Sequence, residues 1–121
     1  AGTVAATAHC TFRLDLPEKL NGFKMGGDDN GNVDVYADRM ELFKKSAGVA
    51  MAFGAIGSAI EGKGKLFFTL YPHMVLSAQK QYNKKGGVDG FIFALSDGRA
   101  LRLRLNGKNN ADEPISLLFG C

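Results

Sequence analysis

The sequence predicts a single, mainly β domain with a minor α part, spanning residues 1–121. Three observations support this fold class. Short segments that alternate apolar and polar residues recur along the chain, as half-buried strands do. Gly, Asp and Asn clusters separate these segments, and the chain holds 16 Gly but only three Pro. A length of 121 residues with 45% hydrophobic residues suits one domain with one core.

The first strand is predicted at residues 11–16, where TFRLDL alternates apolar with polar side chains. Pro17 ends this strand, because proline cannot donate to a strand ladder. Residues 1–10 are small and weakly patterned, and we expect them to form an edge or a poorly ordered segment. The sequence GGDDNGN at 26–32 predicts a turn, because its residues favour turn conformations.

A hairpin is predicted from the next two alternating segments, NVDVYA at 32–37 and RMELFKK at 39–45. The strand at 65–70, KLFFTL, lacks alternation, so we expect both of its faces to be buried. Residues 73–82 continue as a strand with one apolar face, which holds Met74, Leu76 and Ala78.

The best hairpin signal lies between residues 89 and 105, where Ser96-Asp97-Gly98 joins two apolar strands. In its second strand, Leu101, Leu103 and Leu105 are predicted to face the core, with Arg102 and Arg104 facing outward. A short helix follows, for which Asp112 is the expected cap and Pro114 suits the first turn. Its predicted apolar face consists of Ile115, Leu118 and Phe119.

Residues 46–60, here named the Gly-rich segment, interrupt the strand pattern with small, apolar and uncharged residues. We predict a helical insertion that Ser46 could cap, with a mobile apolar loop as the alternative. Each Gly in a helix costs about 1 kcal/mol relative to Ala, so such a helix needs a partner close to its backbone. The segment is too short to span a bilayer. Its candidate self-association residues are Ala50, Met51, Phe53, Gly54, Ile56, Gly57 and Ser58.

The charge is unevenly distributed between the two halves of the chain. Residues 1–62 hold six Lys and Arg against eight Asp and Glu, whereas residues 63–121 hold nine against four. A basic half can bind anionic partners, although a charged, solvated surface is the plainer interpretation. The pattern argues against nucleic acid as a partner, because the aromatic residues face the predicted core rather than the cations. The candidate anion-binding residues are Lys63, Lys65, Lys80, Lys84, Lys85, Arg102 and Arg104.

Signals for catalysis are weak, and we predict no enzyme activity, no cofactor and no metal site. His9 and His73 are the only histidines available for acid–base chemistry near neutral pH. No Cys, His or acidic residues have the spacing of a metal site. Cys10 and Cys121 could form one disulfide if the termini meet, or could remain two free thiols. Free thiols favour a reducing compartment, so the expected location is cytoplasmic, with membrane association as an option.

Two segments carry a resemblance to known domains. VDVYADRMELFKK at 33–45 resembles a strand pair of GRAM and bacterial pleckstrin-homology-like domains, and FIFALSDGRALRLRL at 91–105 is similar to their last hairpin. The resemblance covers about residues 32–119. It implies a partly open β-barrel of two antiparallel sheets with a C-terminal helix. The family's lipid-binding pattern is not matched, because the corresponding loop holds Asp28 and Asp29.

These observations lead to three hypotheses about function. The first is a non-enzymatic binding module that acts through protein–protein contacts or self-association, with the Gly-rich segment as one contact. The second is peripheral binding to anionic membrane lipids through a basic patch. The third is a small β-barrel that carries a hydrophobic ligand in a cavity lined by some of the nine Phe.

Overall fold

The computed structural model describes residues 3–20, 28–45, 64–106 and 110–121. The Gly-rich segment and Lys63 lie outside these residues. Along the described chain the elements are β1 (Ala6–Asp15), α1 (Pro17–Leu20), β2 (Asp29–Val35), β3 (Met40–Lys44), β4 (Lys65–Leu70), the 3-10 turn η1 (Pro72–Met74), β5 (Val75–Tyr82), β6 (Val88–Leu95), β7 (Ala100–Leu105) and α3 (Asp112–Phe119).

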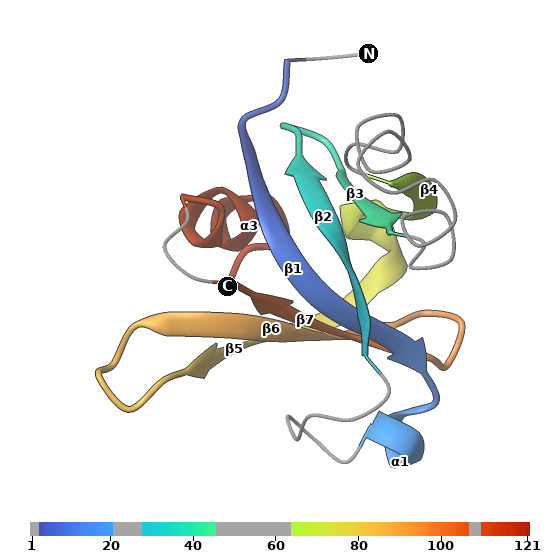
Figure 1. Cartoon of the computed structure of the whole chain (residues 1–121). Helices are drawn as coiled ribbons and strands as arrows, with labels where there is room; N and C mark the ends of the chain where they lie inside the picture. The colour runs from blue at the N-terminus through green and yellow to red at the C-terminus, as the bar shows by residue number, and fades with distance from the viewer. Residues whose placement is uncertain (1–2, 21–27, 46–63, 107–109) are drawn as a thin grey trace.

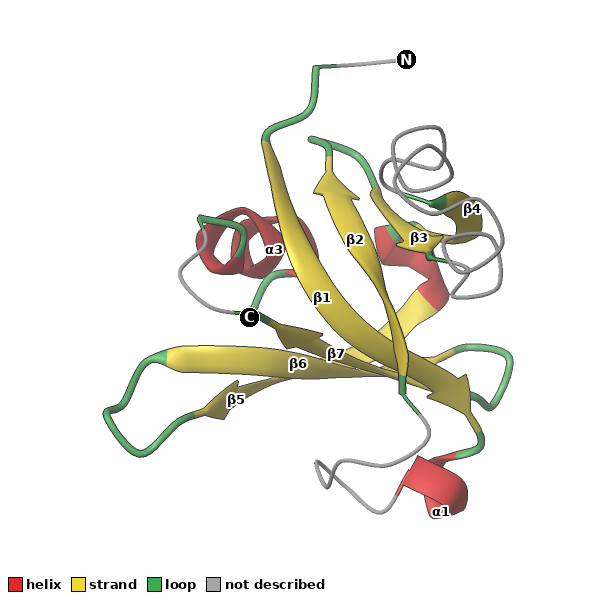
Figure 2. Ribbon diagram, viewed as in Figure 1, coloured by secondary structure: helices red, strands yellow, loops and turns green. Residues whose placement is uncertain are grey.

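The seven strands form one antiparallel sheet in the order β4-β3-β2-β1-β7-β6-β5 (Figure 1). This arrangement confirms the mainly β fold class. Among the described strands, β4 and β5 each have one neighbour, so the sheet is not closed. Figure 2 shows β1 and β2 running steeply across the direction of β5 and β6, so the sheet bends strongly around its core.

The core lies on the concave side of this bend, where the apolar faces of β1, β6 and β7 meet. Phe12, Phe91 and Phe93 are fully buried there. The predicted C-terminal helix is confirmed as α3, which buries Ile115 and places the Phe119 ring 4.8 Å from the ring of Phe93.

The predicted cap of this helix is wrong. The helix begins at Asp112 itself, and the N-cap residue is Ala111, which makes no side-chain cap hydrogen bond. Asp112 and Glu113 instead lie in the first turn, where their negative charge suits the positive end of the helix dipole.

The N-terminal residues differ most from the sequence expectation. Residues 6–10 belong to β1, which lies in the middle of the sheet rather than at its edge. Pairing with β2 begins at Ala6↔Val35 and continues to Phe12↔Asp29. The backbone ladder therefore fixes a strand where the small side chains give almost no pattern.

β2 also begins earlier than expected, because Asp29 already pairs within the predicted turn at 26–32. Gly31 lies opposite Lys44 in the ladder to β3. A Cβ atom at Gly31 would lie 1.7 Å from the carbonyl oxygen of Phe43. A glycine is therefore required here by close backbone approach rather than by a turn.

Two expectations for β4 and β5 are wrong. β4 is an edge strand whose Leu66 is 55% exposed, so its faces are not both buried. In β5, Leu76 is 72% exposed instead of facing the core. The pairing register with β6 shifts between Val75 and Ser77. A one-residue shift exchanges the two faces of a strand, so Val75 packs against the core in place of Leu76.

Candidate functional site

The described members of the predicted basic set lie on several elements of the sheet. Lys65 begins β4, whereas Lys80 lies on β5, and these strands are at opposite ends of the sheet order. Lys84 and Lys85 are both exposed in the turn between β5 and β6. The side chain of Asn83 holds this turn, since its Oδ1 atom accepts the backbone N–H of Lys85 at 2.9 Å.

Arg102 is buried, which corrects the expectation that it faces solvent. Its side chain is 1% exposed and forms an ion pair with Asp28. Its Nη1 atom donates to the carbonyl oxygen of Leu20 at 2.6 Å. The end of α1 and the residue before β2 therefore cover this position on β7. A guanidinium with these contacts is not available to an external phosphate.

Arg104 is only partly exposed, and its role differs from that of Arg102. Its side chain is 23% exposed, and its Nη1 atom lies 3.9 Å from the Oδ2 atom of Asp89 on β6. That carboxylate opposes binding of an anion at Arg104. Of the described members of the predicted set, Lys84 and Lys85 are adjacent and both exposed.

Neither cysteine takes part in a disulfide. Cys10 is a buried free thiol on β1, and Cys121 is an exposed one. Burial raises the pKa of Cys10 to about 12. The Cys10 thiol therefore stays protonated near neutral pH and is a packing group rather than a nucleophile.

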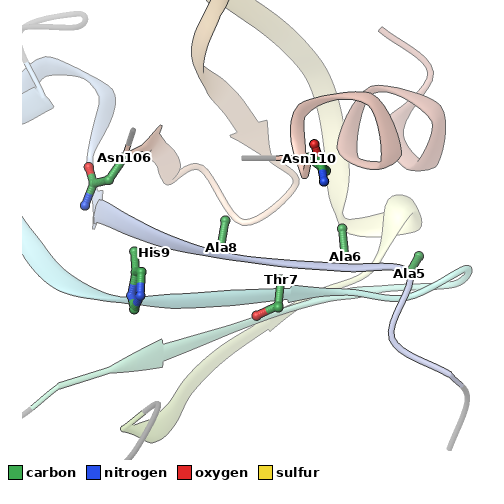
Figure 3. Close-up of a pocket in the computed structure, with 7 residues that line it drawn as sticks. All are labelled: Ala5, Ala6, Thr7, Ala8, His9, Asn106 and Asn110. Atoms are coloured by element: carbon green, nitrogen blue, oxygen red, sulfur yellow. The ribbon is translucent and has the colours of Figure 1, made fainter. Parts of the chain in front are cut away.

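The described pocket of most interest lies along the first half of β1, which the sequence did not single out. It has a volume of about 410 Å³ and lies between β1 and the chain around the end of β7 (Figure 3). No Phe or Tyr is among the described residues that line it. Its lining residues are Ala5, Ala6, Thr7, Ala8, His9, Asn106 and Asn110.

This pocket lies where the two neighbours of β1 pair with different parts of it. β2 pairs with β1 from Ala6 onward, whereas β7 pairs only from Cys10 to Asp15. Among the described strands, β2 is thus the sole partner of residues Ala6–Ala8. We call these three residues the open edge of β1.

The backbone of Thr7 points into the pocket. The carbonyl oxygen of His9 accepts the N–H of Asn106 at 3.0 Å, so the backbone groups of His9 face the β7 side. Backbone groups alternate in direction along an antiparallel strand, so those of Thr7 face the same side. There β7 has ended, and no described backbone group bonds to Thr7.

The side chains around this backbone alternate as well. Figure 3 shows Ala6 and Ala8 on one face of β1, with Thr7 and His9 on the other. The Oγ1 atom of Thr7 donates to the Oδ1 atom of Asp34 on β2 at 2.9 Å. Thr7 is therefore fixed to β2 by a side-chain bond, and on the other side no backbone group of the described residues bonds to it.

Comparison with known proteins does not assign the chain to a family. No family model matches the chain, and no curated protein matches its sequence. In the ranges that the structure describes, no helix is long and apolar enough to cross a membrane. The same ranges contain no group of three or more His, Cys, Asp or Glu side chains placed to hold a metal ion.

Proposed function

We propose that this protein is a non-enzymatic binding module that acts through contacts with other proteins. The observation that carries this proposal is the open edge of β1, where a strand in the middle of the sheet presents backbone to a pocket. Backbone hydrogen-bonding groups of this kind are a common means of recognising extended chains.

The proposed architecture is a pleckstrin-homology-like, partly open barrel, in which β1–β4 and β5–β7 act as two sheets. Three observations support it. The strand order keeps these groups apart and joins them through the β1–β7 pair. The sheet bends between them (Figure 2). The helix α3 packs against the core through Ile115 and Phe119.

Self-association is one form of the proposed activity, and the Gly-rich segment is its predicted surface. That segment lies outside the described residues, so this surface stays a prediction. Small residues there would allow close approach of a second copy. The substitution Gly54→Leu should weaken self-association without unfolding the domain.

The other two hypotheses rank lower. The lipid hypothesis is weaker because Arg102 is buried in an ion pair with Asp28 and cannot contact a lipid headgroup. Binding to anionic lipids would then depend on Lys80, Lys84 and Lys85. The carrier hypothesis requires Phe side chains around a cavity. Phe12, Phe91 and Phe93 instead lie in the packed core, and none of them lines the described pocket.

The proposed function is tested with two measurements on the whole chain. Light scattering over a wide range of protein concentration reports self-association. Selection from a library of random peptides displayed on phage reports recognition of protein segments. We expect a concentration-dependent dimer, enriched peptide sequences, or both. A protein that stays monomeric and enriches no peptide would contradict the proposal.

A further inference from the structure

β5 is the last strand of the sheet, and on its outer side it has no strand neighbour among the described residues. Figure 1 shows this strand and its turn to β6 projecting from the body of the domain. Ser77 and Gln79 are exposed, and the large side chains of Leu76 and Tyr82 are 72% and 62% exposed. The strand is thus accessible at both ends and in its middle.

The backbone groups of β5 alternate in direction, and every second residue points to the outer side. The N–H of Asn83 donates to the carbonyl oxygen of Gly87 at 2.9 Å, so the backbone of Asn83 faces β6. Because direction alternates along an antiparallel strand, the backbones of Ala78, Lys80 and Tyr82 face away from β6. We call these three residues the outward set. Within the described structure, no hydrogen bond engages their outer backbone groups.

The register shifts of this hairpin do not disturb the alternation. The extra residue at the shift between Gln81 and Tyr82 is Asp89, which lies on β6. The other shift lies between Val75 and Ser77, before the outward set begins. β5 itself therefore alternates regularly from Ser77 to Tyr82.

The charge beside this edge is positive. Lys80 belongs to the outward set, and Lys84 and Lys85 are exposed in the turn that follows. The one carboxylate of the hairpin belongs to Asp89, and it lies 3.9 Å from Arg104. Among the described residues, no carboxylate forms an ion pair with any of these lysines. Charge complementarity therefore favours an acidic partner.

We propose that an acidic, extended segment of a partner protein adds to β5 as a further strand. This inference rests on the proposed function and names the chemistry of the partner. The backbone of the segment bonds to the outward set, and its carboxylates lie against Lys80, Lys84 and Lys85. The segment runs antiparallel to β5, as every strand pair of the described sheet does.

The backbone groups favour a protein segment over a lipid headgroup. Each residue of the outward set presents an N–H and a C=O side by side. A phosphate group can accept from the N–H, but it has no donor for the carbonyl oxygen. An extended chain supplies a donor and an acceptor in the same spacing, as in the other ladders of the sheet.

The side chains of β5 indicate the sequence of the segment, because paired residues share one face of a sheet. The residue opposite Lys80 is acidic. The residue opposite Ala78 lies above a methyl group, which leaves room for an apolar side chain. In an antiparallel segment the N-terminal end lies beside Lys84 and Lys85, so further acidic residues come first. The segment is thus acidic at its start and apolar towards its end.

The lysines also explain how this edge avoids other strands. Charged side chains on an edge strand oppose the addition of neutral chains, because each added strand desolvates them. Lys80 repels a basic strand in the same position. An acidic segment removes this obstacle by pairing with the charge, so the feature that protects the edge also selects its partner.

A matched pair of charge reversals tests the lysines. The first variant combines Lys84→Glu with Lys85→Glu. The control combines Lys19→Glu with Lys65→Glu, which reverses the same number of exposed charges on α1 and β4. The probe is a synthetic peptide of the sequence most enriched in the phage selection, with binding measured by calorimetry. We expect an acidic peptide, at least about tenfold weaker binding to the first variant, and a change within about twofold for the control.

N-methylation of the peptide backbone tests strand addition without altering the protein. In an added strand, alternate N–H groups of the peptide point to β5 and the others point away. A series of peptides, each with one methylated amide, should therefore lose at least about tenfold in affinity at every second position and little between them. Losses without this alternation would overturn strand addition.

The outcomes separate this inference from the proposed function. Enriched peptides that are not acidic, or that bind the first variant as tightly as the natural chain, would overturn only the inference, as would a dimer without enriched peptides. Vesicles of phosphatidylcholine and phosphatidylserine provide a further arm. Vesicle binding that the Lys84 and Lys85 reversal abolishes, without any acidic peptide, would assign this edge to membranes and overturn the inference. A monomer without enriched peptides contradicts the proposed function itself.

Discussion

The two halves of β1 form one continuous strand, yet they are held in different ways. Cys10–Asp15 pairs with β7 throughout and with β2 as far as Phe12, and its Cys10 and Phe12 are fully buried. Ala6–His9 has β2 on one side and a pocket on the other, and it contributes only small side chains to the core. The second half stabilises the domain through packing, whereas along Ala6–Ala8 the first half has β2 as its one described strand neighbour.

The largest effect that separates the halves should come from core truncation. Phe12→Ala removes a fully buried ring that lies 5.3 Å from the ring of Phe67. We expect it to lower the free energy of unfolding by about 3–5 kcal/mol. Ala8→Gly in the first half should cost only about 1 kcal/mol, mainly through chain entropy. Urea unfolding of both variants measures the difference, and equal losses would show that the two halves contribute alike.

Hydrogen exchange should separate the halves at the level of single amides. Thr7 and Thr11 are the same residue type and both face the β7 side, but Thr11 pairs with Arg104 whereas Thr7 faces the pocket. The Thr11 amide should therefore exchange at least about a hundredfold more slowly than that of Thr7.

Ala8 provides the control for this measurement, because its N–H faces β2 opposite Val33. We expect its amide to be protected although it lies in the first half. Slow exchange at Thr7 in the free protein would show that its N–H has a partner, and the open edge would then not exist.

The same contrast explains what the sequence could predict. The strand at 11–16 was evident because large apolar side chains alternate with polar ones. Residues 6–9 belong to the same strand, but Ala and Thr differ too little in polarity to show which face is buried. Tertiary pairing with β2 decides that region, and such pairing leaves no local signal.

The candidate site was not predictable for a related reason. It depends on where β7 ends relative to β1, which is a matter of register between residues almost one hundred positions apart. Arg102 illustrates a second limit. The alternation of Arg and Leu along β7 predicts that Leu101 and Leu103 face the core, and both are fully buried. It could not show that Leu20 and Asp28 cover the opposite face of β7.

The smallest expected difference concerns pH, and it involves only the second half. The N–H of Leu16 and the guanidinium of Arg13 both bond to Asp15 and hold its pKa below the ordinary value of 3.8. A lowered carboxyl pKa adds stability above the unfolded-state pKa, and this stability is lost as the pH falls through the folded-state value. Asp15→Asn should therefore flatten the acid dependence of the urea midpoint below about pH 4. Ala8→Gly should leave that dependence unchanged, because the Ala8 side chain is a methyl group that bonds to no carboxylate. If Asp15→Asn has the same acid dependence as the natural chain, the bonds to Leu16 and Arg13 do not stabilise this end of β1.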